Sequence, residues 1–318
     1  MNFLCSCSRQ GIDTTSVLAF VTDDDMEQVL EVMGVATFRH PALGSYPTRS
    51  AHGYGDNVFT AMMWLKTLSV HTVLRCGWDV LFQDADVIWW RDPRPWFQAP
   101  ETRKADTYWQ FDGARSLRYA PFSANSGFYY LRSNPRTRLL LQDLTHSFNL
   151  VAQWRSHQHV LDMLLVEHYS RSGLSVQILS QLDFSIGQTY HRRKYFMREL
   201  LQDQRRPYLF HWSWTAGKHE KIKYSLETGM WYLHGVCTEA RLREHRNNVT
   251  FLHGCCISTD AGVELQSLRR SQSSHHENYT SFVKYPHPFL LPPQELPAWA
   301  FGDEEKPGAK KNKQKKKS

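Results

Sequence analysis

The chain has 318 residues, close to the upper limit for one compact domain and enough for two small ones. Its 41% hydrophobic and 22% charged residues exclude a wholly disordered chain, a collagen and a coiled coil, and a mean hydropathy of −0.52 excludes a multi-span membrane protein. The net charge of +7 lies mostly in residues 303–318, and the remainder, with 31 basic and 28 acidic residues, excludes a strongly basic nucleic-acid-binding body.

The N-terminal residues, MNFLCSCSRQGID, have neither a positive n-region nor an apolar h-region, so no signal peptide or membrane anchor is visible in this chain. Six cysteines permit disulfides, but there is no Cys-x-x-Cys pair to indicate a structural zinc site. N-glycosylation sequons at Asn248 and Asn278 favour a secretory compartment.

Strands and helices alternate along residues 16–235, which we interpret as the folded domain. Helix caps support this pattern: Asn134-Pro135 is a good helix start, and Gly34 and Gly77 follow helix ends. The alternation predicts an α/β fold, a Rossmann-type sandwich with a mainly parallel central sheet. In chain order the expected elements are a strand at 17–22, a helix at 26–33, a strand at 35–38, a helix at 57–75, strands at 79–82 and 128–131, helices at 134–151 and 156–169, a strand at 176–179 and a helix at 215–229.

The most specific motif follows the strand at 79–82. Asp84 and Asp86 stand at the carboxyl end of that strand, where open α/β sheets place their ligand sites. Alternate residues of an extended chain point the same way, so the two carboxylates can share one cation, and oxygen ligands suit Mg²⁺ or Mn²⁺. Such a cation would neutralise a diphosphate and help it to leave.

The segment Gly77–Pro93, which reads GWDVLFQDADVIWWRDP, resembles the metal-binding core of the nucleotide-diphospho-sugar transferases of glycosyltransferase family 77. That family includes plant rhamnogalacturonan xylosyltransferases and extensin arabinosyltransferases, and the resemblance covers about residues 17–233. It implies a GT-A fold, a nucleotide sugar (a UDP-sugar above all) as donor, a glycan or glycoprotein as acceptor, and Mn²⁺ (or Mg²⁺) as cofactor. It also implies retention of the anomeric configuration and a Golgi or secretory-lumen location.

The same resemblance assigns roles to individual residues. It implies that Asp84 and Asp86 hold the metal, that His211 completes the metal site, and that Lys218, in the segment FHWSWTAGK, contacts the diphosphate. Where the family usually has an acidic residue followed by Gln, this chain has His157 before its Gln. The implied substrate contacts are Asp23, Lys66, Asn125, Ser126, Gly127 and Gln158.

From the residues alone, each of these side chains also has a purely structural interpretation. An acidic run such as that at Asp23 commonly begins a helix, and a lysine such as Lys66 commonly extends along a helix surface. Residues 125–127 suit a turn that leads into a strand. His211 suits a buried core position, and Lys218 suits a surface charge.

We predict a metal-dependent retaining glycosyltransferase that moves a pentose or hexose to an acceptor hydroxyl, by front-face attack because no carboxylate is an evident nucleophile. One alternative is a haloacid-dehalogenase-type phosphatase with Asp84 as nucleophile and Asp86 as acid/base. That motif normally opens its fold and needs a late acidic pair, and the sequence matches neither feature. A second alternative is a non-catalytic sugar-binding protein.

After the predicted transferase domain the pattern weakens. Residues 236–300 are first basic and polar and then rich in proline, so we expect a loosely structured C-terminal extension. Residues 301–318 form a Lys-rich tail that we expect to be disordered. With the charge concentrated there, no nucleic acid is expected as a partner.

Overall fold

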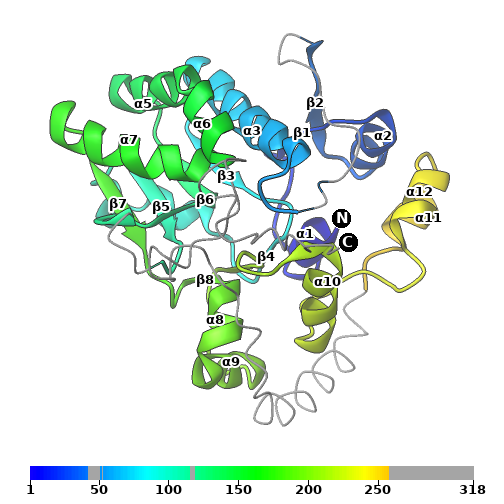
Figure 1. The fold of residues 1–318 in the computed structure, drawn as a ribbon. Coiled ribbons are helices and arrows are strands. Elements are labelled where there is room, and N and C mark those ends of the chain that lie inside the picture. The colour runs from blue at the N-terminus through cyan, green and yellow to red at the C-terminus, as the bar shows by residue number, and fades with distance from the viewer. Residues whose placement is uncertain (42–50, 52, 115–118, 258–318) are drawn as a thin grey trace, which may run out of the picture.

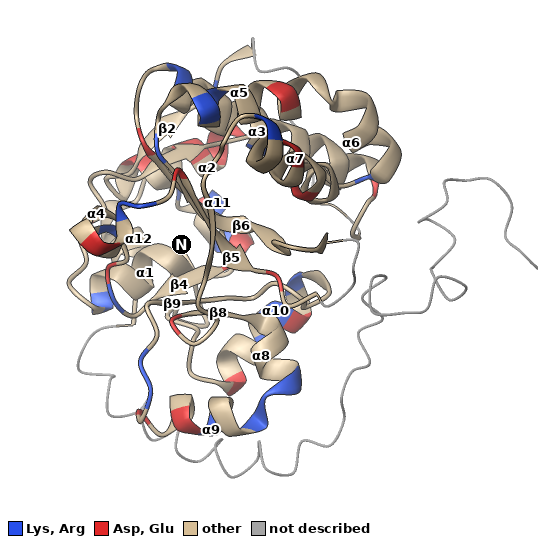
Figure 2. Ribbon diagram, turned by 90° about the vertical axis from the view of Figure 1, so that its left-hand side faces the viewer, with Lys and Arg blue, Asp and Glu red and all other residues tan. Residues whose placement is uncertain are grey.

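The computed structural model describes residues 1–41, 51, 53–114 and 119–257, and all structural statements here concern those residues. They form three sheets with helices above and below (Figures 1 and 2). The strands are β1 Leu18–Phe20, β2 Ala36–Phe38, β3 Val80–Gln83, β4 Val87–Trp89, β5 Thr107–Phe111, β6 Ala124–Leu131, β7 Val176–Leu179, β8 Phe184–Ile186 and β9 Leu209–His211.

The helices differ widely in length, and the longest, α3, has 19 residues. They are α1 Asn2–Arg9, α2 Asp24–Val32, α3 Asn57–Arg75, α4 Arg94–Gln98, α5 Pro135–His146, α6 Phe148–Trp154, α7 His157–Arg171, α8 Gly187–Arg192, α9 Lys194–Leu201, α10 Gly217–Glu227, α11 Glu239–Glu244 and α12 Val249–His253, with a 3-10 turn at Pro100–Thr102. No helix among the described residues is both long enough and apolar enough to cross a membrane.

The α/β class is confirmed, but the mainly parallel central sheet is not, because the sheets are mixed. In the four-stranded sheet, ordered β3-β6-β5-β7, strand β6 is antiparallel to both neighbours and only β5 and β7 are parallel. The second sheet, β4-β9-β8, joins one antiparallel and one parallel pair. Residues 84–86 turn the chain from β3 directly into β4, which belongs to another sheet. A parallel neighbour of β3 would instead have required a helical crossover back to the same sheet.

The central strand β6 separates two hydrophobic layers. Its residues alternate between the faces of the sheet, as the two-residue period of a strand requires. Tyr129 and Leu131 face the layer under α3, α5 and α7, while Phe128 and Tyr130 face the layer that contains Phe97. All eight residues of β6 are buried, and the start of the strand is held beside β5, where Ala124 and Asn125 pair with Phe111 and Gln110.

Most of the predicted helices form, and their caps explain where they begin. Asp56 caps α3 by accepting the Phe59 N–H at 2.7 Å, and Asn134 caps α5 in a capping box with Thr137. The predicted helix at 134–151 is divided in two at Ser147, where α5 ends and α6 begins.

The N-terminal helix α1, which the sequence pattern did not reveal, lies deep in the molecule. Its residues 3–7 are all buried, and the Ser6 hydroxyl accepts a hydrogen bond from the Trp89 N–H of β4 at 3.1 Å. The Asn2 side chain accepts from the Tyr232 N–H at 2.7 Å and donates to the Met230 carbonyl at 3.1 Å. This helix therefore supports β4 from behind and ties it to the C-terminal segment.

One disulfide fastens the C-terminal segment, residues 231–257, to the body of the protein, and a second lies within the segment. Cys5 is bonded to Cys256, and Cys237 is bonded to Cys255. Within this segment residues 236–257, the first part of the predicted extension, form the helices α11 and α12. The rest of the predicted extension, from residue 258 to 300, and the tail at 301–318 lie outside the described residues.

We expect the double variant Cys5→Ala/Cys256→Ala to be clearly less stable than the unmodified protein. This disulfide closes a loop with a sequence separation of 251 residues, so its loss restores much chain entropy to the unfolded state. The free energy of unfolding should fall by about 2–5 kcal/mol, measured by urea denaturation. Cys76→Ser, at an exposed free cysteine, is the matched control. An unchanged midpoint in the double variant would contradict the prediction.

Candidate metal centre

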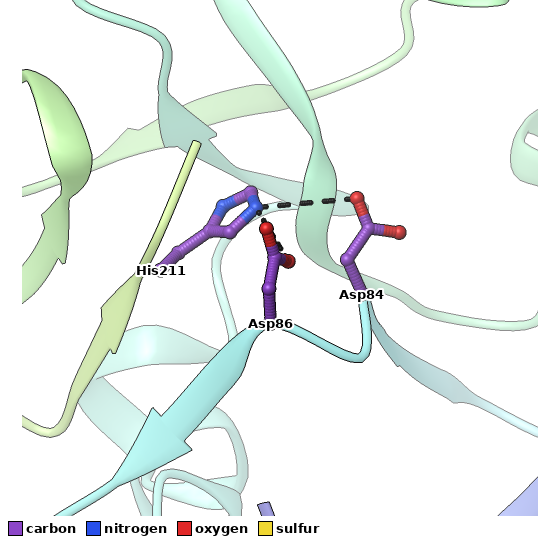
Figure 3. A group of neighbouring side chains, drawn as sticks. All are labelled: Asp84, Asp86 and His211. Atoms are coloured by element: carbon purple, nitrogen blue, oxygen red, sulfur yellow. Dashed lines mark ion pairs between the residues drawn. The ribbon is translucent and has the colours of Figure 1, made fainter. Parts of the chain in front are cut away.

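Three potential metal ligands converge at the turn between β3 and β4 (Figure 3). One ligand atom from each of Asp84, Asp86 and His211 lies within 4.8 Å of the other two. The His211 Nε2 atom is 3.4 Å from an Asp86 oxygen and 3.9 Å from an Asp84 oxygen. These are the same three residues that the sequence motifs suggest as ligands.

Backbone pairing explains why these residues meet. His211 ends β9 in register with Val87 of β4, and the Trp212 N–H donates to the Asp86 carbonyl at 3.1 Å. On the other side of the turn, the Asp84 N–H donates to the Gly127 carbonyl at 2.8 Å. Strands from two sheets therefore fix both ends of the turn.

The imidazole of His211 is buried and held in one orientation by Gln110. The Gln110 amide nitrogen donates to the carbonyls of Phe184 and Ser185, at 3.2 and 3.0 Å. Its oxygen therefore faces the His211 Nδ1 atom, 2.8 Å away, and accepts a hydrogen bond from it. With Nδ1 held by Gln110, the Nε2 atom faces the two carboxylates, which is the orientation that a metal-binding histidine needs.

Two lysines balance the charge of the two carboxylates. Lys66 of α3 lies 2.7 Å from an Asp84 oxygen, and Lys221 of α10 lies 2.6 Å from an Asp86 oxygen. Burial alone would raise the pKa of Asp86, but Lys221 and His211 together hold that pKa well below its usual range. Asp86 is therefore ionised at neutral pH, as a metal ligand must be.

Lys221 is a site residue that the sequence motifs did not identify. The resemblance pointed to Lys218, which lies one turn earlier on α10, is exposed and forms an ion pair with Glu239. The sequence did contain a signal for Lys221. It follows Lys218 by three residues, so the two lysines lie on neighbouring positions of one helix after the segment that holds His211.

The predicted contacts at 125–127 and 158 form one hydrogen-bonded unit beside the cluster. The Gly127 N–H donates to the Asn125 side chain at 2.8 Å, and Asn125 in turn donates to Asp112 at 2.7 Å. Both the N–H and the hydroxyl of Ser126 donate to the Gln158 oxygen at 3.0 Å. The amide nitrogen of Gln158 is therefore the group that this residue can offer to a ligand.

Gly127 is required by space rather than by backbone conformation. A methyl group at this position would lie 2.3 Å from the His211 ring and 2.7 Å from an Asp84 oxygen. Since both contacts are far shorter than van der Waals separation, any side chain here would displace two of the three candidate ligands.

The wall behind the cluster, on α7, carries little charge. His157 is buried, and burial, followed by the nearby Lys66 and His159, lowers its pKa well below the usual value, so it is neutral. Burial and the neighbouring Asp112 raise the pKa of Asp162 well above the usual value. With His157 where the family usually has an acidic residue, this position adds no negative charge beside Asp84 and Asp86.

Asp23 lies at the start of α2, where it accepts the Met26 N–H at 2.9 Å. It also forms an ion pair with Arg243 of α11 at 2.9 Å. Among the contacts seen for Asp23 in the described residues, none reaches the Asp84–Asp86–His211 cluster. A nucleotide contact at this position stays a prediction.

Comparison with known proteins identifies the family. The family model of the nucleotide-diphospho-sugar transferases matches residues 13–224, more than half of the chain. The chain belongs to this family. The match spans Asp84, Asp86, His211 and Lys221, and it favours the transferase prediction over the phosphatase alternative.

Two relatives of this transferase chain are glycosyltransferases by name. It is 26% identical over 199 residues to a UDP-galactose:fucoside alpha-3-galactosyltransferase of Dictyostelium discoideum, covering 58% of this chain and 30% of that one. It is 27% identical over 139 residues to the beta-arabinofuranosyltransferase RAY1 of Arabidopsis thaliana, covering 43% and 25%. The chain thus matches less than a third of either relative's length.

Among solved structures, the chain resembles a glycosyltransferase involved in the glycosylation of the major capsid of PBCV-1. The TM-score is 0.38 with 11% sequence identity, over 65% of this chain and 98% of that one. This is a weak overall likeness.

We expect Gly127→Ala to weaken divalent-cation binding by tenfold or more, because the added methyl group must displace His211 and Asp84. Isothermal titration with Mn²⁺ measures the effect. Gly53→Ala is the matched control, since a methyl group there meets nothing within 4 Å. Equal Mn²⁺ affinities of the two variants would show that these side chains do not hold the metal.

Proposed function

We propose that this chain is a metal-dependent glycosyltransferase that moves a sugar from a nucleotide-diphosphate donor, a UDP-sugar by preference, to a hydroxyl of a glycan or glycoprotein. The observation that carries the proposal is the convergence of Asp84, Asp86 and His211 within 4.8 Å in a member of the nucleotide-diphospho-sugar transferase family. Two carboxylates and one imidazole are a donor set that suits Mn²⁺, with Mg²⁺ as the second choice.

The mechanism follows from where the charges lie. A divalent cation bound by the three ligands would supply positive charge to the departing diphosphate. Lys221 and Lys66, each within hydrogen-bond distance of one carboxylate, lie where their ammonium groups can also meet phosphate oxygens. The role that the motif resemblance gave to Lys218 therefore suits Lys221 better, because Lys218 is paired with Glu239 on the surface.

The donor sugar would meet the polar unit at the start of β6. Asn125, Ser126 and Gln158 are fixed by hydrogen bonds to one another or to Asp112, which limits their motion and favours one sugar orientation. Asp23, near the carboxyl end of β1, would lie on the nucleotide side.

Retention of configuration is proposed to proceed by front-face attack. The remaining buried carboxyl on α7, Asp162, has a raised pKa and accepts the Ala124 N–H at 2.9 Å, so it is a poor nucleophile. Asp84 and Asp86 are occupied as ligands. An acceptor hydroxyl that attacks from the side of the leaving phosphate needs no further carboxylate.

A secretory-lumen location, such as the Golgi, is proposed on two grounds. The disulfides Cys5–Cys256 and Cys237–Cys255 form and persist in oxidising compartments. Asn248, the first residue of a sequon, is exposed at the start of α12. The second sequon, at Asn278, lies outside the described residues.

The proposal is tested by thermal unfolding with UDP and Mn²⁺, added singly and together. At about 100 times the dissociation constant, a ligand stabilises the folded state by roughly 2.7 kcal/mol, or several degrees in Tm. We expect the full shift only with both ligands present, and its loss in Asp84→Asn/Asp86→Asn. A well-folded protein that shows no shift with any nucleoside diphosphate would refute the proposal.

A second prediction separates the two lysines of α10. Lys221→Met should weaken UDP binding in the presence of Mn²⁺ by about 10- to 100-fold, because a charge-assisted hydrogen bond to phosphate is lost. Lys218→Met, three residues away on the same helix, should change it less than threefold. Titration calorimetry gives both values. The reverse order would return the diphosphate role to Lys218.

A further inference from the structure

The sequon Asn248-Val249-Thr250 stands at the start of α12, in the C-terminal segment. All three residues are exposed, and Val249 is 56% exposed. Helix α12, drawn in yellow in Figure 1, lies at the edge of the fold and contacts α2. The folded protein therefore presents the complete sequon to solvent.

The nitrogen atom that would carry a glycan is free. Asn248 caps α12 with its side-chain oxygen, which accepts the Phe251 N–H at 2.9 Å. Within the part of the chain that the structure describes, the Asn248 Nδ2 atom makes no hydrogen bond. A sugar on Nδ2 leaves the amide oxygen in place as an acceptor, so one side chain can carry a glycan and still cap the helix.

Open space lies beside this side chain. Residues 244–249, which run from the end of α11 to the start of α12, line an open hollow on the surface. All of its lining residues except Val249 are polar or charged, and such groups can hydrogen-bond to sugar hydroxyls. The first sugar on Asn248 therefore has room and polar neighbours.

Other contacts keep α12 in place without the help of Nδ2. Leu252 is completely buried, and the ring of Phe251 packs against that of His245 with centroids 4.4 Å apart. The Cys237–Cys255 disulfide closes a loop that contains the sequon. A glycan on Asn248 would therefore extend from a helix that is already fixed, and no packed side chain would have to move.

The Cys237–Cys255 disulfide also indicates where this loop matures. Disulfides form and persist in oxidising compartments, and a sequon is modified in proteins that pass through the secretory pathway. A disulfide and a sequon in one loop therefore point to the same compartment by two independent chemistries.

We propose that Asn248 carries an N-linked glycan. This inference rests on the secretory location proposed above, not on the transferase reaction, and it adds a modification site outside the metal centre. The sugar donor is a lipid-diphosphate-linked oligosaccharide. The bond from Nδ2 to the sugar C1 atom forms, the bond from C1 to the diphosphate oxygen breaks, and the amide nitrogen gives up one proton as the lipid diphosphate leaves.

The test uses the full chain, secreted from eukaryotic cells behind a cleavable signal sequence. Asn278→Gln is introduced throughout, so that Asn248 begins the one sequon left in the sequence. Intact mass before and after peptide-N-glycosidase treatment measures the glycan. Peptide mapping locates it, because this enzyme converts the glycosylated asparagine to an aspartate.

Three matched variants isolate the sequon. Thr250→Val keeps the shape of the side chain and removes the hydroxyl that a sequon requires, whereas Thr250→Ser keeps the hydroxyl. Asn248→Asp keeps an oxygen that can cap α12 and removes Nδ2.

We expect most molecules of the Asn278→Gln protein to lose the mass of one glycan on enzyme treatment, with the conversion at position 248. Thr250→Ser should keep the glycan, and Thr250→Val and Asn248→Asp should lack it. A secreted, disulfide-bonded protein with no glycan at Asn248 would overturn the inference. A glycan that persists in Thr250→Val would overturn it as well.

The UDP–Mn²⁺ thermal shift, measured on the glycosylated and the enzymatically deglycosylated protein, separates this inference from the proposed function. Equal shifts in the two forms support both proposals and the placement of the glycan outside the metal centre. A shift that appears only after deglycosylation would overturn that placement. A glycan at Asn248 on a protein without any shift would refute the transferase proposal alone, and a normal shift without a glycan would refute the inference alone.

Discussion

Two like charges held close together are the constraint on which this structure depends. Only one residue separates Asp84 from Asp86 in the turn between β3 and β4. Because both carboxylates are partly buried, their mutual repulsion must be offset by positive charge. The positive charge comes from Lys66 of α3 and Lys221 of α10, and His211 of β9 lies beside both carboxylates. Three elements that are distant in sequence therefore have to meet at one turn, and the packing of the rest of the domain keeps them there.

The two ends of the described chain brace this turn from behind. Helix α1 packs against β4 and accepts its Trp89 N–H through Ser6, while the Cys5–Cys256 disulfide joins α1 to the C-terminal segment. That segment in turn reaches α2 through ion pairs of Arg243 with Asp23 and Asp25. A region whose sequence predicts loose structure thus becomes, in residues 236–257, a covalently fastened part of the fold.

The residue pattern predicted local features, whereas the distant His211 was grouped with Asp84 and Asp86 only through the family resemblance. The 3.6-residue period and Gly77 just past the helix end predicted α3, and a carboxylate pair after an apolar strand pointed to Asp84 and Asp86. Strands of three residues, such as β8 and β9, are too short to show a period, so the mixed sheet was missed. Gln110 and Lys221 act through contacts that span 101 and 135 residues, and no spacing rule reveals such partners.

The charge balance at the turn also bears on how ligands bind. Two carboxylates with two lysines are close to neutral, and the buried His157 behind them adds no charge. A divalent cation alone would leave an excess of positive charge there, and a diphosphate alone would bring its charge beside two carboxylates. When both bind, their charges largely cancel, and the lysines can turn from the carboxylates to the phosphate oxygens. Under the proposed function, the site would therefore favour a metal–diphosphate pair over either component by itself.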